Sequence, residues 1–444
     1  MRAISPARSH RVAMQNPEVI IDSLNHDGRG VARLEGKAIF VAGALPGERV
    51  TFRYTSRHRN YDEAKVDQIL LASGHRVEPK CPHFGTCGGC ALQHLAAGQQ
   101  IEAKQRVLAE NFERIGKVEP GRWLPALSDK PWGYRRKGRL SVKWVAKKDK
   151  VLVGFREDNP RFVADLSVCH TLLPDVGLHI DALSELIGSM QAKAQIAQIE
   201  IAAGDDAVVL VFRNLVELCV DDLERLKAFG QSHGLGIMLQ PKGPDSVVPL
   251  WPDRIDLYFR IDAADLDLAF KPLDFVQVNA GMNQRMIALA LELLQPQPGD
   301  SVLDLFCGLG NFTLPVARQV ASVAGVEGDQ ALVNRAAENA TRNGIDNARF
   351  HAADLFLDQS TAPWSATRYD KLLLDPPRSG AAQVLEYLPR KGTDRIVYVS
   401  CHPGSLARDA GILVSKHGFR LREAGVMDMF PHTAHVESIA LFER

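Results

Sequence analysis

The C-terminal part of the chain, from Asp300 onward, consists of short apolar runs that each end in a polar or glycine-rich turn. Runs of this length, separated by helical stretches, predict a doubly wound α/β fold with a parallel sheet. The residues after each run then meet at the carboxyl edge of the sheet, where such folds bind ligands. We therefore expect cofactor and chemistry to share one crevice. The expected strands are Ser301–Leu305, Ala324–Val326, Arg349–Ala352, Lys371–Leu374 and Arg395–Val399.

Two further runs close the chain, Phe419–Val426 and Val436–Phe442, joined by a tight turn at Met429–Thr433. If the last strand runs antiparallel to the others, its first residues lie at the same edge of the sheet as Cys401, which follows the expected strand Arg395–Val399. Cys401 and Glu437 would then face one pocket. A thiol and a carboxylate at a ligand edge are candidates for chemistry.

Composition limits the class of protein. A chain of 444 residues with 45% apolar content is too long for one core, so two or three domains are expected. No apolar run approaches the roughly 20 residues that span a bilayer. Residues 1–15 lack the apolar centre of a secretory signal. We expect a soluble, cytoplasmic protein without a membrane segment. Seven cysteines, an odd number, favour metal binding or catalysis over a disulfide framework.

The region before the sheet divides into two expected domains. Residues 17–74, preceded by a disordered stretch 1–16, alternate apolar and polar runs between turns, as in an OB-like β-barrel of roughly five strands. Residues 75–275 mix helices and strands, and residues 276–444 hold the sheet domain. Basic and aromatic residues interleave between Pro131 and Lys150, which predicts an RNA contact or a solvated hairpin. Expected elements are helices Ala97–Ile115, Pro174–Ala194 and Val276–Leu294, and a hairpin Leu140–Phe155.

Three cysteines fall within ten residues, Cys81, Cys87 and Cys90, and Cys169 is a distant fourth candidate. Four thiolates suit tetrahedral zinc or an iron–sulfur cube. Zinc ribbons usually present two Cys-x2-Cys pairs, whereas three close ligands and one remote ligand favour an iron–sulfur cluster. A set of unligated buried thiols is the remaining interpretation. The spacing differs from the Cys-x3-Cys-x2-Cys of radical enzymes and disfavours radical chemistry.

The segment Asp304–Asn311 predicts a cofactor-binding turn between a strand and a helix, with glycines that allow close approach of a ligand. Thr313 stands where the dinucleotide fingerprint has its third glycine, which argues against NAD. Glu327 ends the next strand and is placed to accept hydrogen bonds from ribose hydroxyls. S-adenosylmethionine fits this pattern, because it offers a ribose and an adenine but needs no anion site. Asp354 would lie near the adenine edge.

The sequence Asp375-Pro-Pro-Arg378 holds a carboxylate at a strand end, since each proline restricts the residue before it. Amino-group methyltransferases carry an aromatic in the place of Arg378, so nitrogen methylation is disfavoured. Carbon-5 of uracil becomes nucleophilic when a thiolate adds at carbon-6. The proton at carbon-5 then needs a base. Cys401 suits the first role and Glu437 the second, whereas a buried structural thiol and a solvated glutamate are the alternatives.

Several motifs together resemble the RNA uracil-5-methyltransferases. They are Asp375-Pro-Pro-Arg378, Val399-Ser-Cys401, the segment Asp274–Asn279, and Met429–Thr433 followed by His435-Val-Glu437. The N-terminal β-module is similar to a TRAM domain, and the cysteine set to the [4Fe-4S] site of that family. The resemblance covers nearly the whole chain and is greatest to the branch that acts on large-subunit ribosomal RNA. His402 departs from the asparagine that often follows the nucleophile, and Asp354 stands where an amide can occur.

The resemblance implies a class I S-adenosylmethionine-dependent methyltransferase fold, with a central α+β iron–sulfur domain and an N-terminal TRAM barrel. It implies a monomer that forms 5-methyluridine in 23S ribosomal RNA. A transfer-RNA methyltransferase and a non-catalytic iron–sulfur RNA-binding sensor remain the alternatives. The implied residues are Cys401 as nucleophile and Glu437 as base, Gln277, Phe306, Asn311, Glu327, Asp354 and Asp375 around S-adenosylmethionine, and Cys81, Cys87, Cys90 and Cys169 on the cluster.

Overall fold

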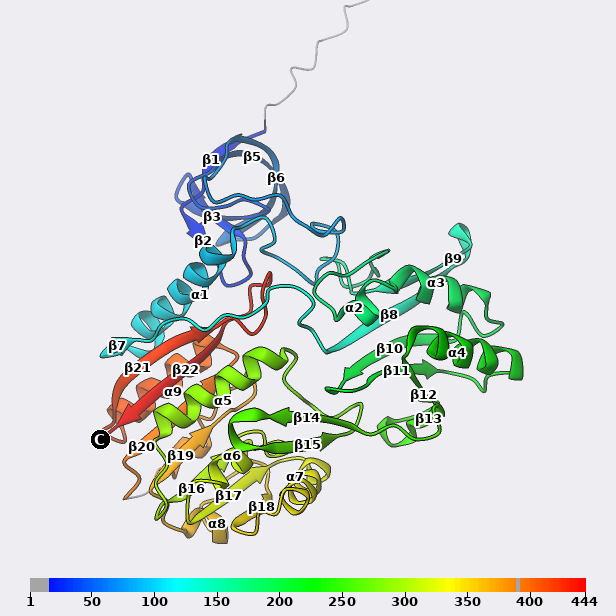
Figure 1. The fold of residues 1–444 in the computed structure, drawn as a ribbon. Coiled ribbons are helices and arrows are strands. Elements are labelled where there is room, and N and C mark those ends of the chain that lie inside the picture. Colours follow the sequence, from blue (N-terminus) through cyan, green and yellow to red (C-terminus); the bar gives the residue numbers. More distant parts are fainter. Residues whose placement is uncertain (1–15, 389–391) are drawn as a thin grey trace, which may run out of the picture. The chain divides into compact units, whose positions relative to one another are not determined.

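The computed structural model describes residues 16–388 and 392–444 (Figure 1). The stretch expected to be disordered, residues 1–16, lies outside the described residues apart from Asn16. By its internal contacts the chain divides into two compact units, Met1–Val77 and Glu78–Arg444. The second unit contains both the cysteine set and the expected catalytic residues, so these residues belong to one compact body. The division of this unit at residues 275 and 276 stays a prediction.

The N-terminal unit, within residues 16–77, is a six-stranded sheet in the order β1-β5-β6-β4-β3-β2. Its strands are β1 (Glu18–Ile20), β2 (Ser23–Leu24), β3 (Gly30–Leu34), β4 (Lys37–Ala42), β5 (Arg49–Arg57) and β6 (Tyr61–Leu71). Alternate residues such as Val50 and Phe52 of β5 point into its small apolar core, which gives the period-2 pattern of the sequence. About five strands were expected, and the unit has one more. Within these residues no pairing of β1 with β2 closes the sheet, so a closed barrel stays a prediction.

The central part of the second unit is a sheet in the order β13-β12-β11-β10-β8-β9, covered by α3 and α4. The expected basic hairpin is confirmed as the antiparallel pair β8 and β9. The expected helix over residues 174–194 is wrong, because it is split after Gly177. The elements are β8 (Lys137–Val145), β9 (Lys150–Gly154), α2 (Pro174–Gly177), α3 (Ile180–Ser189), β10 (Ile196–Ala203), β11 (Val208–Asn214), α4 (Val220–His233), β12 (Gly236–Leu239) and β13 (Val248–Trp251).

Gly177 explains that break. Its carbonyl oxygen accepts a hydrogen bond from the Cys169 amide at 2.7 Å, and a Cβ on Gly177 would lie 2.2 Å from the Cys169 carbonyl oxygen. The chain therefore approaches the segment of Cys169 closely at this point, and only glycine fits. The local helical pattern of the sequence carries no sign of this contact.

The C-terminal sheet has the order β18-β17-β16-β19-β20-β22-β21-β7 within the described part of residues 78–444. Its strands are β7 (Arg122–Trp123), β16 (Ser301–Leu305), β17 (Ser322–Glu327), β18 (Ala348–Ala352), β19 (Lys371–Leu374), β20 (Arg395–Ser400), β21 (Arg420–Met427) and β22 (Glu437–Glu443). The strands β16 to β20 are mutually parallel, and β22 runs antiparallel to β20 with Ser400 opposite Ser438. The doubly wound order and the antiparallel last strand are both confirmed.

Two apolar cores cover the two faces of this sheet. Val302 of β16 and Val397 of β20 belong to one core, whereas their neighbours Leu303 and Ile396 belong to the other. Strands that are buried on both faces read as continuous apolar runs, which is why the sequence located them. Figure 1 shows helices on both sides. The helices are α5 (Ala280–Leu294), α6 (Thr313–Ala317) and α7 (Gln330–Arg342) on the first core, with α1 (Ala97–Asn111), α8 (Pro363–Ala366) and α9 (Pro403–Ser415) on the second.

Two helix boundaries differ from expectation. The helix that begins at Ala97 changes at Phe112 into a π-helical turn, η1 (Phe112–Gly116), because Gly116 packs against α9, where a Cβ would meet the Ala407 carbonyl oxygen at 2.4 Å. The helix expected from Val276 begins at Ala280 instead, because the Asn279 side chain caps it by accepting from the Met282 amide. Gln277 is therefore in extended chain before the helix. A small antiparallel hairpin, β14 (Leu257–Ile261) and β15 (Leu266–Phe270), precedes it.

Candidate active site

A cavity of about 470 Å³ lies at the carboxyl ends of β16 to β20 and at the first residue of β22. This is the edge at which a doubly wound sheet binds ligands, and the volume suits a small molecule. The structure brings together around it every residue that the sequence placed at the cofactor and at the reacting base. They are Gln277, Phe306, Asn311, Glu327, Asp354, Asp375, Cys401 and Glu437.

The turn after β16 forms one wall of the cavity. Phe306 and Gly308 both have positive φ angles, 65° and 56°, so the backbone folds back sharply after Leu305. The amides of Phe306 and Cys307 donate to the Val326 carbonyl oxygen at 2.8 and 3.1 Å. These bonds hold the turn against β17, and its backbone faces the cavity. The Asn311 side chain exchanges two hydrogen bonds of 3.0 Å with Asn283 of α5.

Glu327 ends β17, and its carboxylate accepts hydrogen bonds from three amides in two backbone segments. Its Oε1 accepts from the amides of Gly328 and Asp329, at 2.8 and 3.1 Å, and its Oε2 accepts from the Gly308 amide at 3.1 Å. The carboxylate is thus fixed in orientation at the cavity wall. A carboxylate oxygen has two lone pairs, so Oε2, which accepts one hydrogen bond, still has acceptor capacity for a ribose hydroxyl.

An aromatic pair lines the far side of the cavity beside Asp354. The rings of Phe306 and Phe356 lie 6.0 Å apart at 48°, and Asp354 Oδ1 accepts from the Phe356 amide at 2.9 Å. Phe356 is partly exposed, which leaves a ring edge available to a ligand. Phe356 was not among the expected site residues, although an aromatic two positions after a strand-end carboxylate is a usable signal.

Cys401 and Glu437 occupy neighbouring strand ends. Ser400 pairs with Ser438 across β20 and β22, so Cys401 and Glu437 are the next residues at the same end of these two strands. Glu437 is 6% exposed, and its Oε2 has no hydrogen-bond partner within the described residues. A buried oxygen without a partner is costly, and it is typical of a functional group that awaits a ligand.

The electrostatics of the reacting groups follow from burial. Burial, together with the carboxyl group of Asp375, raises the pKa of Glu437 to about 8. Burial raises the pKa of Asp375 to about 7. Burial, then the charges of Glu437 and Asp375, raises the pKa of the Cys401 thiol to about 12. The Arg378 guanidinium opposes the shifts of Cys401 and Glu437. This cavity, rich in carboxyl groups, is therefore suited to a cationic ligand.

Arg378 itself was not among the expected site residues, although it belongs to the Asp-Pro-Pro-Arg motif. It lines the cavity, and its Nη2 lies 2.9 Å from His435 Nδ1, two residues before Glu437. The departure at His402 has a structural explanation. Its Nδ1 accepts from the Ser405 amide at 3.1 Å and so caps α9, a role that an asparagine side chain also fills.

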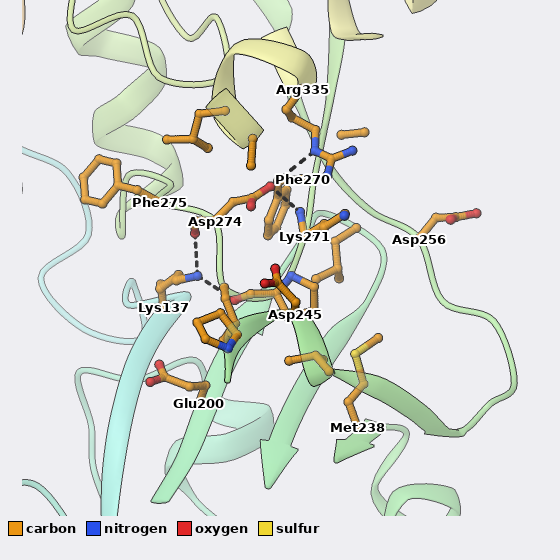
Figure 2. A pocket seen from close by; sticks show the side chains of 18 of the residues that line it. Lys137, Glu200, Met238, Asp245, Asp256, Phe270, Lys271, Asp274, Phe275 and Arg335 are labelled. Carbon is orange, nitrogen blue, oxygen red and sulfur yellow. Dashed lines mark hydrogen bonds and ion pairs between the residues drawn. The ribbon is translucent and has the colours of Figure 1, made fainter. Parts of the chain in front are cut away.

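A larger cavity of about 1350 Å³ adjoins the first (Figure 2). Phe275 and Leu332 line both cavities, and Phe275 is 68% exposed. In Figure 2, Lys137 points toward the loop of Asp274; its Nζ donates to the Pro272 carbonyl oxygen, and Arg335 donates to Asp274 at 3.3 Å. The walls carry both signs of charge, so this groove is not a simple anion site.

Part of the basic segment is structural rather than exposed. Arg136 is buried, and its Nε donates to the Gln277 carbonyl oxygen at 3.1 Å. Tyr134 is also buried, and Trp132 stacks on His432 with ring centroids 3.8 Å apart. The segment was expected to contact RNA or to be a solvated hairpin, and the buried residues Arg136 and Tyr134 fit neither expectation. The exposed basic residues of this segment are Arg139, Lys143, Lys147 and Lys148.

The four expected metal ligands lie together. Cys81, Cys87, Cys90 and Cys169 line one narrow cavity of about 20 Å³, and every cysteine of the chain is free and lies within the described residues. Burial, with repulsion from the other thiols, raises the pKa of Cys90 to about 12 and that of Cys87 to about 11. Yet no group of three or more His, Cys, Asp or Glu side chains in the described residues has the geometry to hold a metal ion.

Within the described residues, none of the helices has the length and apolar content that a membrane-spanning segment requires. The expectation of a chain without such a segment agrees with this finding.

Comparison with known proteins adds three findings. The sequence model of the tRNA (Uracil-5-)-methyltransferase family matches residues 181–444, and that of the TRAM domain matches residues 15–66. The 23S rRNA (uracil(1939)-C(5))-methyltransferase RlmD of Xanthomonas euvesicatoria is 61% identical over 96% of this chain and 97% of its own. The protein of the same name from Stenotrophomonas maltophilia is 60% identical over 100% of both chains.

Among solved structures, the tRNA (uracil-54, C5)-methyltransferase of Pyrococcus abyssi in complex with S-adenosyl-L-homocysteine aligns with a TM-score of 0.74. The alignment covers 96% of this chain and 100% of the other at 24% sequence identity. At that identity the likeness shows the fold, that of an S-adenosylmethionine-dependent methyltransferase.

Proposed function

The chain belongs to the RNA uracil-5-methyltransferase family, and from this we infer that it transfers a methyl group from S-adenosylmethionine to carbon-5 of a uridine in 23S ribosomal RNA. Relatives at about 60% identity over nearly the full chain carry that activity in their names, which favours ribosomal over transfer RNA. The observation that supports the chemistry most is the adjacency of Cys401 and Glu437 at one cavity.

In the proposed first stage the Cys401 sulfur adds to carbon-6 of the uracil. The new S–C6 bond pushes the electron pair of the C5=C6 double bond into an enolate, and carbon-5 becomes nucleophilic. A thiol with a pKa of about 12 is protonated at neutral pH, so its proton passes to solvent as the ligands bind. The positive charges of Arg378 and of a bound sulfonium would both favour the thiolate. S-adenosylmethionine would supply the methyl group: as the bond from carbon-5 to the methyl carbon forms, the sulfonium–methyl bond breaks and S-adenosylhomocysteine leaves.

In the second stage Glu437 acts as the base. Its carboxylate removes the proton from carbon-5, the C–H electron pair restores the C5=C6 double bond, and the C6–S bond breaks to release Cys401 as a thiolate. A pKa of about 8 gives this carboxylate a proton affinity suited to a base near neutral pH. Its unpartnered Oε2 is the atom that we assign to the proton.

The cofactor contacts follow from the cavity walls. We assign the ribose hydroxyls to Glu327 and the adenine to the Phe306 and Phe356 rings beside Asp354. Gln277, Asn311 and Asp375 line the remaining wall. The raised pKa of Asp375 fits a position near the sulfonium, because a cationic ligand would favour its ionised form.

The RNA requires an extruded base, because carbon-6 is not accessible to a thiolate inside a stack. We assign the nucleotides beside the target to the adjoining groove, with the exposed ring of Phe275 as a stacking surface at its border. Lys147 and Lys148, exposed on the turn between β8 and β9, are phosphate contacts in this proposal. The TRAM unit offers Arg53, Arg57, His58, Arg59 and Lys65 as further exposed contacts.

For the cysteine cavity we propose a [4Fe-4S] cluster held by Cys81, Cys87, Cys90 and Cys169. The other three thiols disfavour ionisation of Cys90, so a cationic centre would let these four ligands bind together as thiolates. The cluster would cross-link the segment of Cys81 to Cys90 with that of Cys169. We further propose a monomer that acts in the cytoplasm, where its ribosomal substrate is made.

The test is covalent trapping. RNA that carries 5-fluorouridine at the target position has no proton for Glu437 to remove, so the methylated adduct persists. We expect wild-type protein to form a complex whose mass includes RNA and one methyl group, and Cys401→Ala to form none. Undiminished methylation of uridine by Cys401→Ala would overturn the proposal. Mass mapping of 23S ribosomal RNA from cells without this chain should reveal one missing methyl group.

A further inference from the structure

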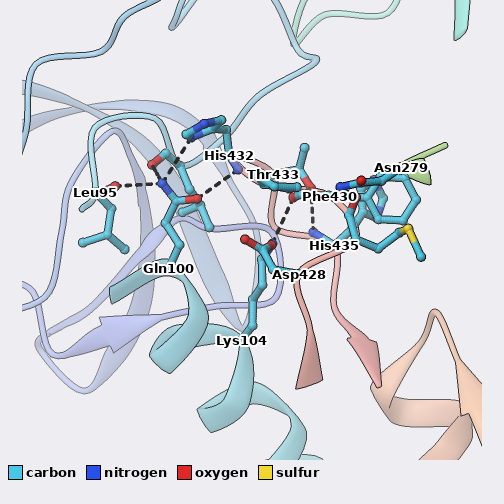
Figure 3. A network of polar contacts seen from close by, with 12 residues as sticks. Leu95, Gln100, Lys104, Asn279, Asp428, Phe430, His432, Thr433 and His435 are labelled. Atoms are coloured by element: carbon cyan, nitrogen blue, oxygen red, sulfur yellow. Dashed lines mark hydrogen bonds and ion pairs between the residues drawn. The ribbon is translucent and has the colours of Figure 1, made fainter. Parts of the chain in front are cut away.

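A buried ion pair lies beside the turn that leads to Glu437 (Figure 3). Lys104 of α1 is 3% exposed and Asp428, the residue after β21, is 8% exposed. Lys104 Nζ donates to Asp428 Oδ1 at 2.6 Å and to the Phe430 carbonyl oxygen at 3.0 Å. Lysine is rarely buried, and an apolar pair of similar volume is often as stable. Stability alone therefore does not explain why a buried ion pair is present here.

The place of the pair gives that reason. In the register of β21 and β22, Met427 lies opposite Glu437, so the turn from residue 428 to 436 begins and ends beside the proposed base. Lys104 holds the first part of this turn through Asp428 and Phe430. Gln100, one helical turn earlier on α1, holds a later part, because its Oε1 accepts from the His432 amide at 2.9 Å.

Other segments hold the same turn. The Tyr134 hydroxyl donates to the Pro431 carbonyl oxygen at 3.1 Å, and the amides of Ala91 and Leu92 each donate to the His432 carbonyl oxygen at 2.9 Å. These contacts fix the backbone of the turn without any charge. Lys104 is thus the member of this network that adds a positive charge to the surroundings of Glu437.

The charges that face Glu437 come from four elements. Asp375 follows β19, Arg378 lies in the loop after it, Cys401 follows β20, and Lys104 comes from α1. Asp375 and the thiolate of Cys401 disfavour the ionised carboxylate, whereas Arg378 and Lys104 favour it. Arg378 also lines the cavity and meets the ligands. Lys104 does not line the cavity and so meets neither ligand. Burial lowers its pKa, whereas Asp428 and Glu437 oppose that shift and favour the charged ammonium.

We propose that Lys104 is a positioning residue for the proton-abstraction step: held by Asp428 and the Phe430 carbonyl, it fixes the turn before Glu437 and keeps a positive charge facing that carboxylate. This inference rests on the proposed role of Glu437 as the base. It assigns Lys104 no contact with the substrate. Loss of the charge should impair removal of the carbon-5 proton and leave the earlier methyl transfer intact.

The experiment compares Lys104→Met, Lys104→Arg and the double variant Lys104→Met/Asp428→Leu with wild type. The double variant replaces both charges with apolar groups and so avoids an unpaired buried carboxylate. Lys371→Met is the matched control, because Lys371 pairs with Asp300 at 2.6 Å at the opposite end of the sheet. Thermal unfolding and S-adenosylmethionine binding verify that each variant is folded.

The readouts separate the two steps. Trapping on 5-fluorouridine RNA reports adduct formation and methyl transfer, and tritium release from 5-tritiated uridine RNA reports proton abstraction. In Lys104→Met and in the double variant we expect unchanged trapping and accumulation of the adduct on ordinary RNA. The apparent pKa of the acidic limb of the pH–rate profile should rise by about one unit. At pH values below that pKa, the rate should therefore be about tenfold lower than that of wild type. Lys104→Arg should restore most of the rate, and Lys371→Met should resemble wild type.

An unchanged acidic limb without adduct accumulation in the double variant would overturn the role of Lys104. Equal loss of trapping and tritium release would also overturn it, because that pattern indicates a general structural defect. Failure of the proposed function is a distinct result: wild-type protein itself would then give no adduct on 5-fluorouridine RNA.

Discussion

The catalytic cavity and the cysteine cavity both collect groups that resist ionisation, but they differ in what surrounds those groups. The catalytic cavity, about 470 Å³, places Arg378 and the nearby Lys104 against its carboxyl groups. In the cysteine cavity, about 20 Å³, the charges that raise the pKa of Cys90 are those of the other three thiols, and Asp158 joins Cys169 and Cys81 in raising the pKa of Cys87. The first cavity holds carboxyl groups that titrate near neutral pH and has room for a ligand, whereas we propose a permanent cationic centre for the second.

This contrast indicates how one chain can hold both a catalytic thiol and structural thiols. A residue that must gain and lose a proton requires a pKa near the working pH, and opposing charges tune it there. A ligand of a metal cluster must stay ionised, and a cation provides that directly. Cys401 and Cys90 have equally raised pKa values, about 12, yet we assign them opposite fates. The surroundings of each thiol, rather than its own acidity, distinguish the nucleophile from the ligand.

Replacement of Cys401 should have the largest effect and tests the contrast between the two cavities most strongly. We expect Cys401→Ala to lower the rate of methyl transfer by more than about 10³-fold, because the thiolate addition has no substitute. S-adenosylmethionine affinity, measured by calorimetry, should change little. Cys219→Ala, which alters a half-buried cysteine outside both cavities, is the control. If Cys401→Ala retained a tenth of the wild-type rate, Cys401 would not be the nucleophile, and the two cavities would not differ in the way that we propose.

Cys169→Ala should have the second largest effect, and on stability rather than on chemistry. Anaerobically purified wild-type protein should show the visible absorbance of an iron–sulfur cluster and contain iron and sulfide. The variant should lose both and unfold at a lower temperature, since metal binding energy is folding energy. Its affinity for S-adenosylmethionine should remain near that of wild type, because the cofactor cavity lies elsewhere. Identical iron content in both proteins would exclude Cys169 as a ligand.

The pH dependence of stability should be moderate and have a definite sign. Glu437 and Asp375 have folded-state pKa values of about 8 and about 7, above those of the unfolded chain. The folded state therefore binds more protons, and the contribution of these groups to stability is lost as pH rises through those values. The melting temperature of the ligand-free protein should fall from about pH 5, just above the pKa of the unfolded carboxyl groups, to about pH 8, above which it should level off.

Two comparisons sharpen that result. Glu437→Gln cannot ionise, so its melting temperature should fall less over the same range. S-adenosylmethionine, as a cation beside these carboxyl groups, should stabilise the protein more at high pH than at low pH. A stabilisation by this ligand that is the same at every pH would show that its charge does not meet the carboxyl groups.

The smallest effect is expected at Phe356. Its ring offers the adenine an apolar contact of about 0.5–1.5 kcal/mol, so Phe356→Ala should weaken S-adenosylmethionine binding by about 2- to 12-fold. Phe356→Tyr keeps the ring and should bind as wild type does. Leu357→Ala, at an exposed neighbouring position, is the control for loss of apolar surface. Equal affinity of Phe356→Ala and wild type for S-adenosylmethionine would show that the adenine does not contact this wall of the cavity.

Much of the sheet could be predicted from the sequence, because its strands are buried on both faces and appear as continuous apolar runs. Ser301–Leu305 and Lys371–Leu374 were predicted at their observed bounds. The helix boundaries could not be predicted in the same way. Gly177 and Gly116 end helical segments through close contacts with the carbonyl oxygens of Cys169, in the loop before the helix, and of Ala407 on α9. Local helical periodicity contains no trace of such contacts.

The same limit applies to charge. The basic segment before Lys150 looked uniformly exposed, but Arg136 is buried against the Gln277 backbone. Lys104 lies on the expected helix Ala97–Ile115, and nothing nearby in the sequence marks it as different from a solvated lysine. Its partner Asp428 is 324 positions away. Phe356 was missed for a different reason, since its nearness to Asp354 was visible in the sequence and was not used.

The sequence by itself determined where most strands of the sheet lie in the chain, the edge at which their polar ends meet, and the types of residue that gather there. These properties depend on continuous apolar runs and turn chemistry among neighbours in the chain. Only the tertiary structure decided which charges are withdrawn from water and which opposite charges face them. Desolvation depends on segments brought together from distant parts of the chain, so the proton affinities of Glu437 and Asp375 emerge only once those segments are packed.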